Sequence, residues 1–200
     1  MKSVIFAAAV ASAAAFAPAP VAKTTSALNA FEGELGAQPP LGFFDPLGLL
    51  DDADQERFDR LRYIELKHGR ISQLAFLGQI WTRAGGHFAG PIDYAGHSFE
   101  SYPNGLAAIW GPDSISAYGT AQIVSFIGLL EIAVMKDVNG TGEHVGDFRN
   151  NIGPAWNVDE ETKLKKRGIE LNNGRAAMMG ILGLMMHEQL GGELPVVGPM

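Results

Sequence analysis

Three long apolar segments, separated by polar stretches that contain glycine and proline, dominate the pattern of the chain. They run from about Gln55 to Trp81, from about Ile115 to Met135 and from about Glu160 to Gln189. Each is followed by glycine or asparagine, which are typical of helix ends. At 1.5 Å per residue each segment reaches about 30 Å as a helix, close to the hydrocarbon thickness of a bilayer. The pattern predicts an all-α membrane protein with three transmembrane helices.

The first and third segments are related by an internal repeat. Residues 62–70 read RYIELKHGR, and residues 167–175 read RGIELNNGR. Within a window of 17 residues, eight positions are identical at a constant offset of 105, and charged residues are among them. Unrelated apolar helices rarely carry the same charges in the same register, so we interpret these two helices as a duplicated pair that flanks an unlike middle helix.

The repeat places charged residues inside apolar helices, where an unpaired charge costs about 2.5–3.5 kcal/mol on insertion scales. Lys67 is long enough to extend to the interface. Glu65 and Arg70 are five residues apart, about 140° around a helix, which disfavours pairing within one helix. Two helices that cross near a pseudo-twofold axis can instead pair Glu65 with Arg175 and Glu170 with Arg70. Solvated charges on soluble amphipathic helices are the alternative, and the long apolar stretches disfavour it.

The first thirty residues have the composition of a targeting leader. They contain no Asp or Glu, and Lys2 precedes an apolar stretch, Val4–Ala15, that is too short to span a bilayer. Residues 21–28 are hydroxylated and basic, as in plastid transit peptides. We therefore predict a bipartite plastid leader over residues 1–30 and a three-helix domain over residues 31–200. An ordinary secretory signal is the alternative.

Composition and charge exclude several classes of function. The chain has no cysteine, which excludes disulfides, cysteine zinc sites, iron–sulfur clusters and thiol nucleophiles. A net charge of −7 disfavours binding to nucleic acid. Nine Lys and Arg residues flank the predicted helices on the side where the first and third begin, and Arg83 alone lies on the other. The positive-inside rule then predicts a stromal N-terminus for the mature chain.

Single polar side chains along the three helices are candidate ligands. The candidates are Glu65, His68, Gln122, Glu131, Glu170, Asn173 and His187. Gln122 and Glu131 are nine residues apart and therefore point to opposite sides of the middle helix. Ligands that do not converge form neither a hydrolytic metal centre nor a proton dyad. Dispersed ligands suit many cofactors that each need one axial ligand, such as a magnesium chlorin.

Three of these candidates have a structural alternative. Gln122 can be a hydrogen-bonding partner between helices. Glu131, to which no arginine is assigned, can be a protonated acid. His187, near the end of the third segment, can face lipid headgroups.

The run FFDPLG at residues 43–48, the ExxHGR and ExxNGR helices and the polar residues of the middle helix resemble the light-harvesting chlorophyll-binding family. Residues 170–180 and the following His187-Glu188 resemble more specifically the fucoxanthin–chlorophyll a/c-binding proteins of diatoms and related algae. The resemblance implies an antenna protein of the plastid thylakoid membrane, without catalytic residues, that passes excitation energy to photosystem cores. It also implies that all seven candidate ligands bind the central magnesium of chlorophyll.

The resemblance further implies ion-pair roles for Arg70 and Arg175 and carotenoid contacts near Asp45 and Pro46. The implied cofactors are chlorophyll a, chlorophyll c and fucoxanthin, with a xanthophyll-cycle carotenoid as a further candidate and magnesium only within chlorophyll. The implied partners are other antenna subunits, photosystem cores and thylakoid lipid. Two other functions stay open: a stress-type member that quenches excitation, and a small ion-coupled membrane carrier.

Overall fold

The computed structural model describes residues 31–51, 53–135, 142–148, 158–191, 193–194 and 198–199. Its long helices are α2 (Gln55–Arg83), α4 (Ala117–Ala133) and α5 (Glu160–Leu190). Two short helices, η1 (Phe99–Ser101) and α3 (Ala107–Trp110), lie between α2 and α4. Strand β1 (Glu193–Leu194) pairs antiparallel with β2 (Gly198–Pro199). The three helices predicted from the sequence are confirmed, and the predicted leader, residues 1–30, lies outside the described residues.

Local side-chain chemistry explains where the two longest helices begin and end. The carboxylate of Asp54 accepts a hydrogen bond from the backbone N–H of Arg57 at 2.9 Å and caps α2. Asp159 caps α5 in the same way, through the N–H of Thr162 at 2.9 Å. Helix α5 ends at Gly191, whose φ of 66° is in the left-handed region that favours glycine.

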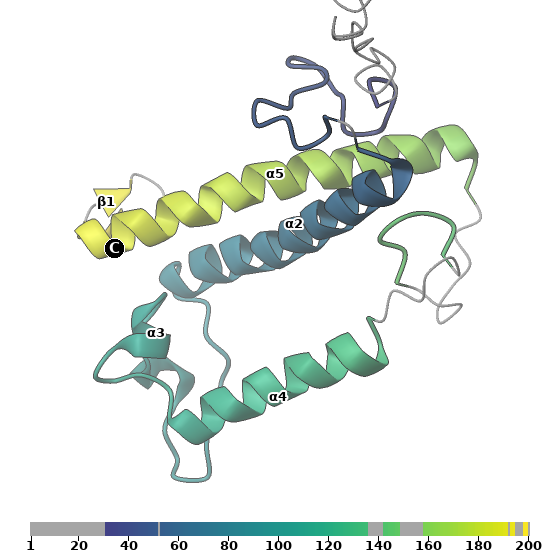
Figure 1. Ribbon diagram of the computed structural model, residues 1–200. Helices are drawn as coiled ribbons and strands as arrows, with labels where there is room; N and C mark the ends of the chain where they lie inside the picture. The colour runs from purple at the N-terminus through teal and green to yellow at the C-terminus, as the bar shows by residue number, and fades with distance from the viewer. Residues whose placement is uncertain are drawn as a thin grey trace, which may run out of the picture.

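Helices α2 and α5 pack side by side as the core of the fold, and α4 lies beside them (Figure 1). The backbones of the two helices are in close contact at Gly69 and Gly174. A Cβ atom added to Gly69 would lie 3.0 Å from the Cα atom of Gly174. Leu66 and Leu171, on either side of this contact, are buried. The absence of side chains at both glycines therefore sets the distance between the helices.

Among the helices that the structure describes, none is long and apolar enough to cross a membrane by hydropathy. The three helices are present, but the apolar length predicted for each transmembrane span is not found. Helix α4 has 17 residues rather than the 21 expected, which corresponds to about 26 Å. Helices α2 and α5 are longer, with 29 and 31 residues, but many of these residues are charged.

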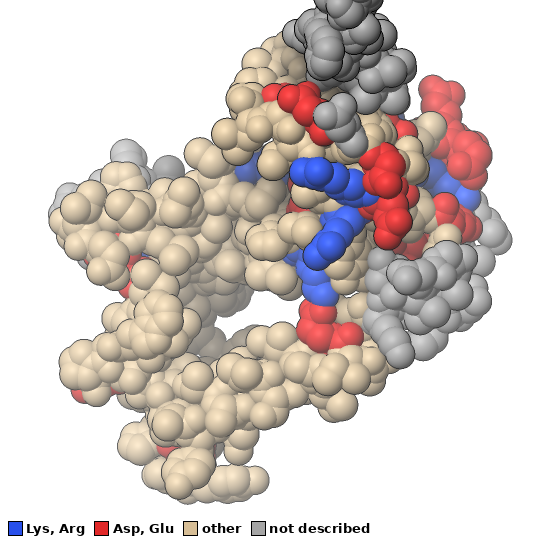
Figure 2. Space-filling view, in the orientation of Figure 1, with Lys and Arg blue, Asp and Glu red and all other residues tan. Residues whose placement is uncertain are grey.

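Large apolar side chains remain uncovered on α4, where no residue is buried. Exposed examples are Val124, Phe126, Leu129 and Ile132. In the space-filling view, an open gap lies between part of α4 and the α2–α5 pair, and charged side chains gather at the end where α2 and α5 begin (Figure 2). The polypeptide therefore leaves an apolar surface next to an open space between the helices.

Candidate functional site

Two reciprocal ion pairs join α2 to α5 beside the glycine contact. Arg70 on α2 donates through Nε to Glu170 Oε1 at 2.6 Å. Arg175 on α5 donates through Nε to Glu65 Oε1 at 2.7 Å. The structure thus brings together the four residues that the repeat suggested as partners. Each carboxylate is half-buried and has its charge balanced by a guanidinium group of the other helix.

Each of these arginines also binds a loop through a second nitrogen. Arg70 Nη1 donates to the carbonyl oxygen of Gly146 at 2.8 Å, and Arg175 Nη1 donates to that of Gly36 at 3.0 Å. A Cβ atom at Gly146, whose φ is +83°, would lie 2.8 Å from Leu66 Cδ1. The sequence analysis did not predict either loop contact. Gly36 and Gly146 were the signals in the sequence, but a glycine in a loop does not by itself indicate an arginine contact.

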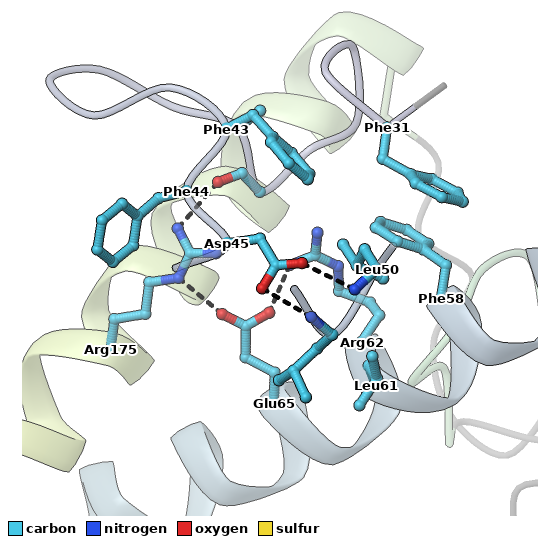
Figure 3. A pocket seen from close by; sticks show the side chains of 13 residues that line it. Phe31, Phe43, Phe44, Asp45, Leu50, Phe58, Leu61, Arg62, Glu65 and Arg175 are labelled. Carbon is cyan, nitrogen blue, oxygen red and sulfur yellow. Dashed lines mark hydrogen bonds and ion pairs between the residues drawn. The ribbon is translucent and has the colours of Figure 1, made fainter. Parts of the chain in front are cut away.

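A cavity of about 290 Å³ lies between the N-terminal segment and the crossed helices. Its lining includes Phe31, Phe43, Phe44, Asp45, Leu50, Phe58, Leu61, Arg62, Glu65 and Arg175 (Figure 3). The cavity therefore combines aromatic walls with the Glu65–Arg175 ion pair on one side. Asp45, an expected carotenoid contact, lines it, whereas the neighbouring Pro46 is exposed and is not part of the lining.

Asp45 holds the turn that forms one wall of this cavity. Its carboxylate accepts backbone hydrogen bonds from Leu50 at 2.7 Å and from Leu49 at 3.0 Å. The N–H of Leu50 is the main cause that lowers the pKa of Asp45 below its ordinary value. An ionised Asp45 therefore shapes the loop, and both of its oxygens are engaged by the backbone.

His68 is exposed on α2, and its ring is oriented by the backbone. Its Nδ1 lies 2.8 Å from the carbonyl oxygen of Ile64. Because a carbonyl only accepts hydrogen bonds, Nδ1 carries the proton and donates it. In the neutral ring, Nε2 then has its lone pair available as a ligand, the arrangement found in metal-binding histidines.

The other nitrogen and amide candidates are distributed over the surface of the bundle. Asn173, Gln122 and His187 are all exposed. The neighbour of Asn173, Asn172, donates to the side chain of Gln38 in the N-terminal segment. Within the part of the chain that the structure describes, no three His, Asp or Glu side chains are grouped to hold a metal ion. The candidate ligands Asn173, Gln122 and His187 therefore lie at separate places on the bundle.

Glu131 on α4 has a cationic partner that sequence reasoning missed. Lys67 on α2 donates through Nζ to Glu131 Oε2, and it also contacts the hydroxyl oxygen of Tyr63 at 3.3 Å. Lys67 therefore links the first helix to the middle helix, a contact that its length alone did not suggest. The two residues are 64 positions apart, Lys67 is not one of the residues that the two repeats share, and Glu131 lies on the middle helix, so no pattern in the sequence pointed to this pair.

A second polar cluster, in which the Arg83 and Glu188 side chains are 8% and 9% exposed, lies at the opposite end of the helices. The Glu188 carboxylate of α5 accepts from Arg83 Nη2 at 3.2 Å and from Gln79 Nε2 at 2.9 Å, both on α2. It also accepts from the backbone N–H of Leu106 at 2.7 Å, just before α3. A Cβ atom at Gly105 would lie 2.3 Å from this carboxylate. Glu188 thus fastens the α2–α4 connection to the end of α5.

A family model and individual relatives of this chain indicate the same protein family. Residues 31–189 match the family described as Chlorophyll A-B binding protein. The chain is 69% identical to a fucoxanthin-chlorophyll a-c binding protein, chloroplastic, of Trieres chinensis over 100% of both chains. It is 64% identical to fucoxanthin-chlorophyll a-c binding protein E of Phaeodactylum tricornutum, over 97% of this chain and 98% of that protein. With protein B of Macrocystis pyrifera the identity is 51%, over 90% and 82%. The chain therefore belongs to the chlorophyll a-b binding protein family.

Proposed function

We propose that the chain is a light-harvesting antenna protein that binds chlorophyll a, chlorophyll c and fucoxanthin. The observation that carries this proposal is the 69% identity, over the full length of both chains, to a protein named for binding fucoxanthin and chlorophyll a and c. The function makes and breaks no covalent bond, so the chain is not an enzyme. Its task is to fix the distance, orientation and electrostatic surroundings of its pigments.

The chemistry of the exposed donors fits chlorophyll, whose four equatorial ligands come from its own ring. His68 offers Nε2, because its Nδ1 proton is donated to Ile64. Glu65 and Glu170 offer carboxylates that are neutralised by arginine, which lowers the cost of placing them in apolar surroundings. Magnesium accepts both carboxylate oxygen and imidazole nitrogen. The further proposed axial ligands are Gln122, Glu131, Asn173 and His187.

Chlorophyll bound at these positions supplies the absorption of light. The chain's own residues hold the ligands in place: Arg70 and Arg175 orient the two repeated carboxylates, and Lys67 orients Glu131. The aromatic cavity beside Glu65 is small for a whole carotenoid, so we assign to it one end group of fucoxanthin. A xanthophyll-cycle carotenoid is the alternative occupant.

The proposed location is the thylakoid membrane of a plastid, with all three helices as spans and the N-terminus of the mature chain in the stroma. Relatives named as chloroplastic support the compartment. Bound pigments would cover the exposed side chains of α4. Pairing of the charges on α2 and α5 would lower the cost of placing these two helices in the membrane despite their low hydropathy. Residues 1–30 are proposed as the targeting leader, and other antenna subunits and photosystem cores as partners.

Reconstitution of the full chain with purified chlorophyll a, chlorophyll c and fucoxanthin in detergent tests this function. We expect a stable pigment–protein complex in which light absorbed by fucoxanthin or chlorophyll c appears as chlorophyll a fluorescence. A variant with both Glu65→Leu and Glu170→Leu is the control and should bind fewer chlorophylls. A wild-type chain that takes up no pigment, or pigments that transfer no energy, would contradict the proposal.

The alternative of an ion-coupled carrier requires carboxylates that share one cavity. Glu65, Glu170 and Glu131 are each paired with a separate cation instead. A stress-type quenching member would share the pigments proposed here. It would differ in a short chlorophyll fluorescence lifetime in the same reconstituted complex.

A further inference from the structure

The two carboxylates of the repeat do not have the same surroundings, and the difference lies at Arg62. Arg62 Nη1 donates to Glu65 Oε2 at 2.6 Å, from the preceding turn of the same helix. Arg175 Nε donates to the other oxygen, Oε1, at 2.7 Å. Glu65 thus binds one guanidinium group through each of its oxygens, and Figure 3 shows it between the two arginines.

Among the described residues, the equivalent carboxylate on α5 has one guanidinium partner. Glu170 accepts from Arg70 at 2.6 Å through Oε1. Arg167 occupies the position in the repeat that corresponds to Arg62, three residues before the carboxylate. Among the described residues, no hydrogen bond or ion pair links Arg167 to Glu170. The sequences of the two repeats are therefore alike here, but their contacts are not.

The N-terminal segment explains why Arg62 turns toward Glu65. The guanidinium carbon of Arg62 lies 5.2 Å from the centre of the Phe58 ring, and Phe31 stacks on that ring at 4.4 Å. Gly36 covers the other side, where a Cβ atom would lie 2.3 Å from Arg62 Nη2. The side chain of Arg62 is 12% exposed. Aromatic contact and close backbone packing thus hold its charge in place.

The corresponding loop over α5 has a different arrangement. Its aromatic ring, Phe148, lies 5.2 Å from the guanidinium carbon of Arg70. The space beneath Gly146 is filled by Leu66. Arg167 therefore has no equivalent of the Phe58 and Gly36 contacts among the residues described.

We infer that Arg62 makes Glu65 and Glu170 into electronically different pigment ligands, an inference that rests on the proposed function. A charge-assisted hydrogen bond draws electron density from a carboxylate, so Glu65 is the weaker axial donor. Glu65 thus lies between two guanidinium groups, and Glu34 also interacts electrostatically with Arg62, whereas among the described residues Glu170 has the guanidinium group of Arg70 alone. Axial donation and nearby charge both tune the electronic states of a bound cofactor. Arg62 is a positioning residue that separates the excitation energies of the two chlorophylls.

Matched variants of the reconstituted full chain test this inference. Arg62→Met removes the charge and keeps much of the length, Arg62→Lys keeps the charge, and Arg167→Met is the control at the equivalent repeat position. Glu65→Leu and Glu170→Leu first identify, by difference absorption and circular dichroism, the red band of the chlorophyll at each site.

We expect Arg62→Met to retain the full chlorophyll content but to shift the band assigned to Glu65. Arg62→Lys should restore much of the wild-type band, and Arg167→Met should leave both bands unchanged. Equal shifts in Arg62→Met and Arg167→Met, no shift in either, or pigment loss in Arg62→Met that lysine does not rescue would each overturn the role of Arg62. Full pigment content in Glu65→Leu would instead overturn the proposed ligand itself.

Discussion

Arg70 and Arg175 each use one guanidinium group to join three parts of the chain. Nε reaches the carboxylate of the opposite helix, and Nη1 reaches the backbone carbonyl of a loop. The planar group with several donors allows both contacts, which a lysine would not reproduce. At the scale of single residues, the carboxylates proposed as ligands therefore depend on side chains from distant parts of the sequence.

The first prediction concerns Arg70→Leu. We expect it to remove the chlorophyll proposed at Glu170, which lies on the other helix, and to lower stability by about 1–3 kcal/mol. The variant would leave Glu170 half-buried without its cation. The loss is smaller than for a fully buried ion pair, because solvent partly screens the carboxylate. Pigment analysis and thermal denaturation of the reconstituted protein measure both effects. Arg175→Leu is the matched control and should weaken the pigment of Glu65 instead, by less, because Glu65 keeps its contact with Arg62. Pigment loss confined to α2 in Arg70→Leu would exclude cross-pairing.

The second prediction concerns the ion pair between Lys67 and Glu131. Glu131→Leu is expected to lose one chlorophyll, and Lys67→Met is expected to weaken binding at the same site because the carboxylate loses its partner. A double-mutant cycle should give a coupling energy of about 0.5–3 kcal/mol. Pigment content and melting of the two single variants and the double variant measure it. Strictly additive effects would show that the pair does not support the ligand.

At the scale of elements, helix contact is controlled by small residues rather than by large apolar ones. Gly69 and Gly174 are in backbone contact because neither has a side chain. Gly78, further along α2, has nothing within 4 Å of an added Cβ atom. The crossing point and the ion pairs lie next to each other in sequence. A change in helix separation at the crossing should therefore also move the carboxylates proposed as ligands.

The third prediction compares two glycine substitutions on α2. Gly69→Ala should separate the helices and destabilise the pigment-loaded protein by about 1–3 kcal/mol through overpacking. Gly78→Ala should be neutral, or stabilising by up to about 1 kcal/mol, because alanine favours the helix. Thermal denaturation followed by circular dichroism distinguishes them. Similar melting temperatures for the two variants would contradict the role of the close contact.

At the scale of the whole molecule, charge and apolar surface are segregated. Charged side chains gather where α2 and α5 begin (Figure 2). Exposed apolar side chains extend along α4. Loops and helix caps at the charged end include carboxylates that accept backbone hydrogen bonds, such as Asp45 and Asp159. The stability of this end should therefore depend on pH.

The fourth prediction follows from these two carboxylates. The backbone N–H of Leu50 lowers the pKa of Asp45, and that of Thr162 lowers the pKa of Asp159. A depressed pKa contributes stability above the ordinary value, and this contribution is lost as pH falls through the folded pKa. We therefore expect resistance to limited proteolysis to be constant at neutral pH and to decline below about pH 4. Asp45→Asn should reduce the pH dependence of cleavage within residues 31–51, and an unchanged profile would contradict the assignment.

The amino-acid sequence by itself determined the helices and the repeat. Helix α2 was expected from about Gln55 to Trp81 and is observed over Gln55–Arg83, because capping residues and apolar periodicity act locally. The repeat suggested the partners of Glu65 and Glu170, since related helices that cross about a common axis exchange equivalent residues.

Only the tertiary structure decided which residues from other parts of the chain contact the polar side chains of these helices. The Lys67–Glu131 pair, the loop carbonyls bound by the arginines and the Glu188 cluster all join residues distant in the sequence. Arg62 shows this most clearly. Its counterpart in the repeat, Arg167, is also an arginine three residues before a glutamate, yet the two arginines make different contacts. What distinguishes them is the packing of a separate segment against one helix, and a local sequence pattern does not contain that information.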